Sequence, residues 1–576
     1  MELQKVERID DLGFIAAFLN KSGLSGFIDK HYPVHGSWEG PSFGKLTLGW
    51  LLYMISSCDH RLCKVEDWAA SRIDVLRVLL DAPDLSSKHF EDQRLEIMLD
   101  AYSGSGDWNS FMADYTHNLL RVYDLNGEVV RLDAMIGQSF RKVQGFFQMG
   151  YSKHHRSDLP QIKQMVAMLD PFALPVAMLL VSGDRADDQL YLPLIKEVQR
   201  SLASEGLLYV GDSKLSSLSN RAGIVQSNNG YLCPLSLAQL SVESRKELLK
   251  AAPTEPEMSR VYRDEQKAEE LLAYGFEASR SQHYSYTEEK SLEWEETLFG
   301  VYSPAYGDKK RAAFEDRLEK GQAALKELLV KKQGRKQLTD FKQLEQGIQR
   351  IEKKYQIQGL IKTQIIEHKH TRKIRKHGNR PAREENFSTF EIEISLQHSA
   401  IKAQKALLGW QVYAHYSPSK QLDLKQAILM YRKQYRIEHK FDQLINRNLN
   451  MIPFFLKIQK RITALIQLLQ LALQFVTLIE QTLRSSIAQQ ENPEALTNLY
   501  PGNPGRKTLS PTTYLILNAF ANISLAFFKA QDGQTYVQMT PLSPIQKKLI
   551  QLAQFQLHIY TKIPQFFKTA LNLAET

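Results

Sequence analysis

Cysteine is scarce in this chain, with three cysteines among 576 residues. So few thiols exclude a scaffold stapled by disulfides and are typical of a protein in a reducing compartment. The first residues, MELQKVERIDDLGF, lack the basic and then apolar order of a secretory signal. We therefore expect a cytoplasmic protein.

Hydrophobic runs of membrane-spanning length are also lacking, apart from one stretch. Ile462–Ile479 carries no formal charge over eighteen residues, close to the length of a short span. A helix over this stretch would have three glutamines on one face and four leucines on the opposite face, namely Gln467, Gln470 and Gln474 against Leu465, Leu468, Leu469 and Leu473. It is predicted to be a buried amphipathic helix, and we expect no membrane contact.

The remaining composition is that of a soluble globular protein. Hydrophobic residues make up 43% of the chain and charged residues 24%, so large cores can be buried. A length of 576 residues predicts several domains. The formal net charge of +9 is compatible with a polyanionic partner.

Two acidic residues mark the ends of predicted strands. Residues 1–121 carry helical apolar periodicity, and at Gly127 the pattern becomes extended. Glu128–Ala134 alternates as a strand with Asp133 near its end, and the apolar strand Leu207–Ser213 has Asp212 at its carboxyl end. The other elements predicted in this region are a strand hairpin, two helices and a last strand, at Gln161–Leu169, Leu174–Ser182, Gln189–Leu202, Ser216–Ser227 and Tyr231–Leu235.

A third acidic residue lies in a helix predicted over Leu424–Asn446. The apolar seam of this helix consists of Leu424, Ile428, Tyr431, Tyr435, Phe441 and Ile445. Glu438 falls within the seam. A carboxylate there must be paired, protonated or bound to a metal, because burying it as a free charge costs several kcal/mol or more. The alternative is a glutamate at the edge of the seam that reaches water or pairs with a neighbouring arginine.

The order of these elements is that of a ribonuclease-H-like domain. We therefore predict an α/β fold in which a ribonuclease-H-like catalytic core is interrupted by a large mixed α+β insertion and flanked by helical N- and C-terminal domains. The predicted parts are a helical N-terminal domain that could bind DNA ends (1–121), the first part of the core (122–235), the insertion (236–420), the second part of the core with the catalytic helix (421–460) and a helical C-terminal domain (461–576).

The predicted insertion has three recognisable parts. Arg260–Val301 reads as mainly extended, and seams in Lys310–Lys332 and Leu338–Gln356 predict an antiparallel helical hairpin. Residues 361–383 hold eight Lys or Arg against one acid, a local net charge of +7. This density predicts a flexible phosphate-binding loop, the alternative being a loop that is merely solvated. The candidate DNA contacts in it are Lys369, Arg372, Lys373, Arg375 and Lys376.

Collinear blocks of sequence extend over nearly the whole chain. They are RVYDLNGEVVRLDA, GYSKHHRSDLPQIKQMVAMLDPFALPVAMLLVSGDRADDQLYLPLI, LLYVGDSKLSSLSNRAGI and YLCPL in the core, DDLGFIAAFLNKSGLSGFIDKHYPVHGSWEG and CDHRLCKVEDWA near the amino end, and LTNLYPGNPGRKTLSPTT and MTPLSPIQKKLI in the tail. These blocks resemble bacterial insertion-sequence transposases of the DDE class, in the insertion sequence four group.

The resemblance implies an enzyme that cuts DNA at the ends of its own element and joins them to target DNA, with Asp133, Asp212 and Glu438 as catalytic carboxylates. It implies two Mg²⁺ or Mn²⁺ ions about 3.5–4 Å apart, one activating the nucleophile and one stabilising the leaving oxygen. Asp133 would bridge them. The implied partners are double-stranded DNA, as terminal inverted repeats and target, and a second copy of the chain that forms a homodimer on DNA. We expect the protein in the bacterial cytoplasm and on the nucleoid when DNA is bound.

The family surrounds its glutamate with a Tyr-Arg-Glu-Lys signature that this chain matches in part. Tyr431 matches, whereas Gln434 stands where the arginine is expected and Ile445 where the lysine is expected. The candidate substitutes for DNA contact include Arg432 and Arg436. Related transposases use a tryptophan in the strand predicted at Leu407–Tyr416 to stack on a flipped base, which makes Trp410 a candidate, with core packing as the alternative.

Two other hypotheses stay open. The departures from the signature are compatible with a catalytically impaired DNA-binding relative that acts as a transposition regulator by competing for the same DNA ends. A basic helical scaffold protein without chemistry is the third hypothesis, and it leaves the placement of the three acids unexplained.

Overall fold

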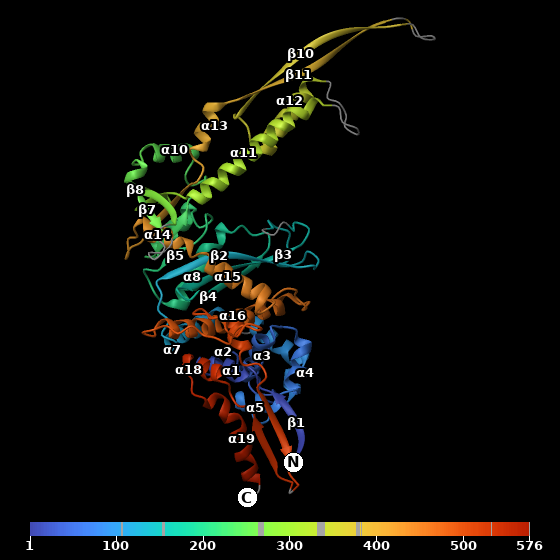
Figure 1. The fold of residues 1–576 in the computed structure, drawn as a ribbon, viewed down its shortest axis with the longest axis vertical. Helices are drawn as coiled ribbons and strands as arrows, with labels where there is room; N and C mark the ends of the chain where they lie inside the picture. The colour runs from blue at the N-terminus through green and yellow to red at the C-terminus, as the bar shows by residue number, and fades with distance from the viewer. Residues whose placement is uncertain are drawn as a thin grey trace.

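A nine-stranded mixed sheet lies at the centre of the computed structural model (Figure 1). The structure describes residues 1–576 except 105–107, 153–155, 263–269, 331–339, 376–380, 382, 532 and 575–576. The strand order is β4-β3-β2-β5-β6-β12-β9-β8-β7. The strands are β2 (Val129–Gln138), β3 (Gln161–Asp170), β4 (Leu174–Ser182), β5 (Leu208–Val210), β6 (Gly230–Pro234), β7 (Ser259–Tyr262), β8 (Leu271–Ser285), β9 (Ser291–Tyr302) and β12 (Trp410–Tyr416).

The half of the sheet from β4 to β6 contains the strands predicted from alternation and apolar runs. β2 pairs antiparallel with β3, and β3 pairs antiparallel with β4. β5 pairs parallel with both β2 and β6. β3 is buried at every position because it lies between two strands and is covered on both faces. The five predicted strands are confirmed, with ends shifted by a few residues.

Helices cover both faces of this half. On one face lie α8 (Tyr191–Leu202) and α9 (Leu218–Gln226), whose apolar residues share a core with Val130 and Leu132 of β2. On the other face lies α14 (Leu424–Arg432), which shares a core with Val210 of β5. Because side chains alternate along a strand, the odd-numbered residues of β2 that include Asp133 face the side of α14.

The strands of the other half come from the predicted insertion. β12 pairs with both β6 and β9, and β8 and β7 complete the edge. A buried polar network joins the two halves, in which Arg221 of α9 and Tyr231 of β6 both donate hydrogen bonds to Glu296 of β9. The extended part of the insertion is therefore continuous with the core sheet. Val242–Lys250 (α10) was not predicted.

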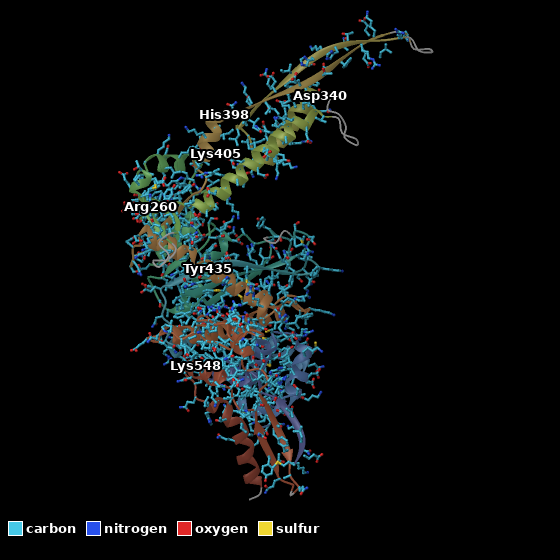
Figure 2. The ribbon with its side chains drawn as sticks, viewed as in Figure 1. Arg260, Asp340, His398, Lys405, Tyr435 and Lys548 are labelled. Carbon is cyan, nitrogen blue, oxygen red and sulfur yellow. The ribbon has the colours of Figure 1, made fainter. Side chains whose placement is uncertain are left out.

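The rest of the insertion forms an arm that projects from the sheet (Figure 1). It contains α11 (Pro304–Lys326), α12 (Phe341–Tyr355), β10 (Ile361–Ile374), β11 (Arg383–Leu396) and α13 (His398–Lys405). α11 and α12 pack through a small core that includes Phe314, Leu325, Leu344 and Ile348, so the predicted helical hairpin is confirmed. Figure 2 shows side chains projecting into solvent along the arm, where Asp340, His398 and Lys405 are labelled.

The predicted flexible basic loop is wrong, because residues 361–374 form one strand of a long two-stranded ribbon. β10 pairs antiparallel with β11 over its whole length. Alternating residues at the base of the ribbon, including Ile365, Ile392 and Ile394, pack on the helical hairpin. The sequence signal was missed because lysine and arginine density masks the alternation of isoleucine and threonine in this stretch.

The two ends of the chain share one core, in place of the two separate helical domains predicted. β1 (Glu2–Arg8) pairs with β13 (Ser524–Lys529), which also pairs with β14 (Thr535–Met539), and the termini lie close together in Figure 1. The helices of these ends are α1 (Leu12–Lys21), α2 (Leu24–His31), α3 (Phe43–Ser57), α4 (Val65–Ala70), α5 (Ile73–Leu79), α6 (Asp92–Gly104), α7 (Trp108–Val122), α16 (Gln459–Ala488), α17 (Thr513–Asn518), α18 (Pro544–Leu552) and α19 (His558–Ala574).

The long helix α16 runs through the middle of this shared core. It is long and apolar enough to cross a membrane, and 89% of its most apolar window is buried inside the protein. The buried helix is confirmed, but its glutamine face is not solvated. Gln470 and Gln474 are buried, and Gln474 donates a hydrogen bond to the Pro175 carbonyl of β4 at 2.7 Å. This bond gives the Gln474 amide group a partner of the kind that a buried polar group needs.

Candidate active site

Asp133 lies on β2, and Asp212 lies two residues after the neighbouring parallel strand β5. β2 and β5 pair with Arg131 opposite Val210, and the Gly211 amide still donates to the Leu232 carbonyl of β6. This register, carried two residues further, puts Asp212 beside Asp133. Both residues are half-buried. Strands in register lie about 4.8 Å apart, so the two residues lie side by side just beyond the end of the short strand β5.

Tyr191 of α8 and backbone amides orient the two carboxylates. The Tyr191 hydroxyl donates a hydrogen bond to Oδ1 of Asp212 at 2.7 Å, and the Lys214 amide donates to the same oxygen at 2.8 Å. The Ala134 amide donates to Oδ1 of Asp133 at 2.7 Å. Burial, with the negative charges of Asp212 and Asp133, raises the pKa of Tyr191 well above its usual value, so the hydroxyl keeps its proton. Tyr191 was not singled out in the sequence.

Tyr431 of α14 approaches the same pair from the other face of the sheet. Burial raises its pKa well above the usual value, and the charges of Tyr413, Asp212 and Asp133 act in the same direction. Its ring packs edge-on against Tyr413 with centroids 4.8 Å apart. The predicted signature tyrosine is therefore close to both aspartates.

Glu438 lies on the exposed face of α15 (Tyr435–Asp442), which corrects the prediction that it belongs to a buried seam. The predicted helix breaks at Lys433 and Gln434, where a turn separates α14 from α15. The break rotates the apolar face, so that Ile437 and Phe441 are buried whereas Tyr435 is 51% exposed. The apolar spacing predicts a single uninterrupted helix over Leu424–Asn446, and the break is the reason why the predicted burial of Glu438 is wrong.

The position of Glu438 relative to the sheet follows from Gln434, one turn earlier. The Gln434 side chain donates to the Leu132 carbonyl of β2 at 3.4 Å, and α15 packs against β2. Residues four apart lie on the same side of a helix, so Glu438 lies about 6 Å further along the axis than Gln434. Glu438 is exposed there, at the edge of the face that contacts β2. Even so, no group of three or more His, Cys, Asp or Glu is assembled for metal binding within the described part of the chain. Within the described residues, Asp133 and Asp212 therefore lie side by side, but Glu438 does not join them in a group that could hold a metal ion.

Arg131 is a buried site residue that the sequence analysis missed. It is 0% exposed, and its guanidinium donates to Asp170 at 2.6 Å, to the Met430 carbonyl at 2.8 Å and to the Gln434 side chain at 3.2 Å. These bonds tie β2 to the end of α14 and to the break before α15. The alternation in EVVRLDA puts Arg131 on the same face of the strand as Asp133, and this pattern could have identified Arg131 from the sequence.

The cations expected around Glu438 are mostly engaged within the protein. Arg436 donates to the Pro171 carbonyl at 3.1 Å and is half-buried, whereas Arg432 is exposed. Gln434 is occupied by Arg131 and Leu132, and Ile445 packs against the large core. Neither position of the signature therefore supplies a cation here.

Trp410 lies in an aromatic cluster on the far half of the sheet. Its ring centroid is 5.4 Å from that of Tyr302, 5.9 Å from that of Phe276 and 6.1 Å from that of Tyr274. The indole is half-buried. This arrangement is the one expected for the core-packing alternative, and stacking on DNA stays a prediction.

The ribbon places carboxylates opposite some of its cations. Arg372 faces Glu385, and Lys373 faces Glu384 with a 3.4 Å ion pair, so the local charge of +7 is partly balanced across the strands. Lys369 faces Ser388. Lys369, Arg372, Lys373 and Arg375 are all exposed, and Lys376 lies outside the described residues.

Comparisons with known proteins identify no family for this chain. No protein-family model matches the chain, and no curated protein matches it. One solved structure that matches is the cryo-EM structure of piggyBac transposase synaptic complex with hairpin DNA, at 12% identity and a TM-score of 0.24. The match covers 50% of this chain and 61% of that chain. At this TM-score the similarity carries no conclusion about fold, site or activity.

Proposed function

We propose that the chain is a metal-dependent DNA transposase that binds the ends of an insertion sequence, cuts them and joins them to target DNA. One observation carries the proposal, namely the parallel pairing of β2 with β5, whose register, continued two residues past the end of β5, puts Asp212 beside Asp133. The strand order β4-β3-β2-β5-β6, antiparallel and then parallel, is the order expected of a ribonuclease-H-like core. The collinear sequence blocks described above add the reaction type.

The two aspartates form a donor set that fits Mg²⁺ or Mn²⁺. Magnesium in proteins is commonly held by one or two carboxylates, with waters and substrate phosphate filling the other positions. When bound, the ions would activate the attacking hydroxyl and stabilise the leaving oxygen. Tyr191 holds the Asp212 carboxylate in one orientation, and Arg131 fixes the helix break that sets the direction of Glu438. Glu438 is proposed as the third carboxylate, on the exposed side where DNA would arrive.

We propose double-stranded DNA as the substrate and a homodimer on DNA as the working form, because two ends must be held together for strand transfer. The cytoplasm, and the nucleoid when DNA is bound, are the proposed location. The alternative of a catalytically impaired regulator is favoured by one observation, which is that Gln434 and Ile445 are both engaged inside the protein. Such a protein would bind the same DNA ends without cutting them.

The proposal is tested by Mg²⁺-dependent cleavage of a duplex that carries the DNA flanking the coding sequence of this chain. We expect cleavage by the native protein and loss of at least roughly a hundredfold in rate with Asp212→Asn. Asp158→Asn is the matched control, because Asp158 is an exposed loop aspartate paired with Arg156. Equal cleavage by Asp212→Asn and Asp158→Asn would contradict the proposal. Binding without cleavage by all three proteins would favour the regulator.

A further inference from the structure

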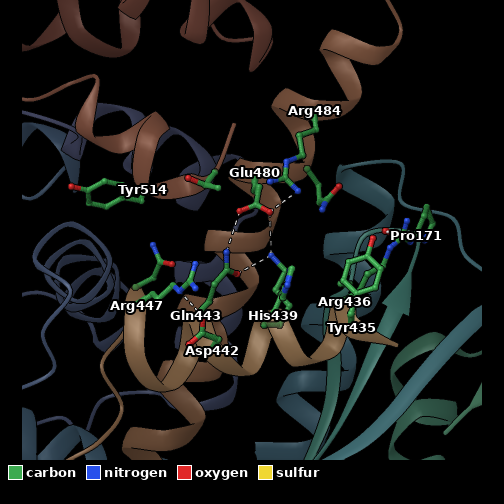
Figure 3. Close-up of a pocket in the computed structure, with 15 residues that line it drawn as sticks. Pro171, Tyr435, Arg436, His439, Asp442, Gln443, Arg447, Glu480, Arg484 and Tyr514 are labelled. Carbon is green, nitrogen blue, oxygen red and sulfur yellow. Dashed lines mark hydrogen bonds and ion pairs between the residues drawn. The ribbon is translucent and has the colours of Figure 1, made fainter. Parts of the chain in front are cut away.

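A cavity of about 820 Å³ opens beside α15 and takes no part in the two-aspartate site (Figure 3). Its walls come from α15, the π-helical segment Gln443–Arg447 that follows it, α16, the start of α17 and the turn between β3 and β4. These elements come from separate parts of the sequence, with Pro171 on the turn and Tyr514 on α17. The volume lies in the range of roughly 300–1,000 Å³ that ligand sites occupy.

The cavity is basic. Its cationic lining residues are Arg436, Lys440, Arg447 and Arg484, and its carboxylates are Asp442 and Glu480. Lys440 and Glu480 are buried and form an ion pair at 3.7 Å, and Arg484 also pairs with Glu480 at 2.8 Å. Lys440 and Arg484 are therefore engaged in ion pairs within the protein. Arg447 differs from them because its side chain is 74% exposed and is paired only locally with Asp442 at 2.5 Å. Four cations against two carboxylates attract a polyanion.

Two exposed tyrosines border the cavity. Tyr435 is 51% exposed and Tyr514 is 59% exposed. Figure 3 shows them on opposite sides of Glu480, from α15 and α17 respectively. Large aromatic side chains left in solvent beside a basic surface are suited to stacking on nucleic-acid bases. Because the rings do not face each other across one slot, they fit successive nucleotides of a strand better than a single free nucleotide.

The cavity is continuous with the helix face that carries Glu438. Successive helix residues are rotated by about 100°, so Tyr435 lies about 60° around α15 from Glu438. Arg436 and His439 lie further round in the same direction, inside the cavity. A strand that passes over Tyr435 would therefore run from Glu438 into the cavity.

We propose that this cavity binds the sugar-phosphate backbone of the DNA strand next to the position of cutting, with Arg447 contacting a phosphate and Tyr514 stacking on a base. The inference rests on the proposed function, since it takes DNA as the substrate. It adds a binding surface formed by α15, α16 and α17 that does not depend on the Tyr-Arg-Glu-Lys positions.

The test measures DNA binding by fluorescence anisotropy across a salt series, using labelled single-stranded and double-stranded oligonucleotides and the full chain. Arg447→Gln is expected to weaken binding roughly fivefold and to reduce the slope of log affinity against log salt by about one. Tyr514→Ser is expected to weaken single-strand binding roughly fivefold or more and to leave the salt slope unchanged. Both side chains are exposed, so neither change removes a buried contact.

Arg200→Gln is the matched control, because Arg200 is an exposed arginine paired locally with Glu197 on α8, on the other face of the sheet. It is expected to bind DNA as the native protein does. DNA binding by the native protein with no change in either cavity variant would overturn the inference and leave the proposed function intact. A second experiment measures the binding of deoxyadenosine monophosphate by calorimetry. If Arg447→Gln loses this binding while its DNA binding is unchanged, the cavity is a site for a small phosphate compound and the inference is overturned. Absence of DNA binding by the native protein would overturn both proposals.

Discussion

At the scale of single residues, Arg131 of β2 and Asp170 of β3 form a buried ion pair beside the candidate site. Arg131 is 0% exposed and Asp170 is 7% exposed, and Arg436 lies 3.6 Å from the same carboxylate. Removing one member of a buried pair leaves the other charge without adequate compensation, and this costs about 3–5 kcal/mol. We expect Arg131→Met to lower the free energy of unfolding by about that amount in urea titrations.

The double variant Arg131→Met with Asp170→Asn separates this cause from lost packing. Because the second change removes the uncompensated charge, we expect it to restore much of the lost stability. A double variant no more stable than Arg131→Met would show that the bonds to Met430 and Gln434 matter more than the ion pair.

Asp11 gives a pH dependence that can be measured on stability alone. Burial raises the pKa of Asp11 to about 6. Because the folded-state pKa exceeds the unfolded one, the folded protein binds the extra proton, and this stabilisation is complete below about pH 4 and lost as pH rises to about 6. Asp11→Asn cannot titrate, and its amide oxygen can still accept the hydrogen bond that Ser56 donates.

We therefore expect Asp11→Asn to equal the native protein in stability near pH 4 and to exceed it at pH 7 by at most roughly 3 kcal/mol. Urea unfolding at both pH values measures the difference. Asp84→Asn, which changes an exposed aspartate, is the control and should show no such crossover. A constant difference between Asp11→Asn and the native protein across this range would contradict the account.

At the scale of elements, the ribbon β10–β11 is a surface where charge is balanced across strands. Because Glu384 and Glu385 face Lys373 and Arg372, they lower the local positive potential. We expect Glu384→Gln with Glu385→Gln to strengthen DNA binding roughly threefold and to steepen its salt dependence. Glu288→Gln with Glu289→Gln makes the same charge change on an exposed turn of the body and is the control. Equal strengthening by both pairs would show an effect of net charge alone.

Elements were predictable from the sequence where one signal dominated. The strand at Glu128–Ala134 and the run LLYVGD could be recognised from alternation and apolar content. They placed Asp212 just past the end of β5, but β2 continues to Gln138, so Asp133 lies in the middle of its strand and the prediction that it marks a strand end is wrong. The helix around Glu438 could be predicted only in part, because its break at Gln434 depends on bonds to Arg131 and Leu132 that are distant in sequence. The ribbon was missed for a related reason, since cross-strand partners such as Glu385 lie outside the basic stretch.

At the scale of the whole molecule, the two ends of the chain form one shared core. Helices α1, α3 and α6 pack against α16, apolar residues of α1 to α7 belong to the same core, and β1 pairs with β13. Periodicity could indicate helices at both ends, but a shared core depends on which apolar faces meet, which sequence order does not record. We expect a fragment of residues 1–126 to show no cooperative thermal transition by circular dichroism, because it loses the apolar surface of α16. Cooperative unfolding of this fragment alone would contradict the shared core.

The measurement that tests the central claim most directly compares the native protein with Glu438→Gln on the flanking DNA ends in Mg²⁺. Glu438 is exposed, so its substitution should leave the fold and DNA affinity unchanged. We predict cleavage by the native protein and loss of at least roughly a hundredfold in rate with the variant. Full cleavage by Glu438→Gln would contradict a three-carboxylate site, and binding without cleavage by the native protein would contradict the transposase itself.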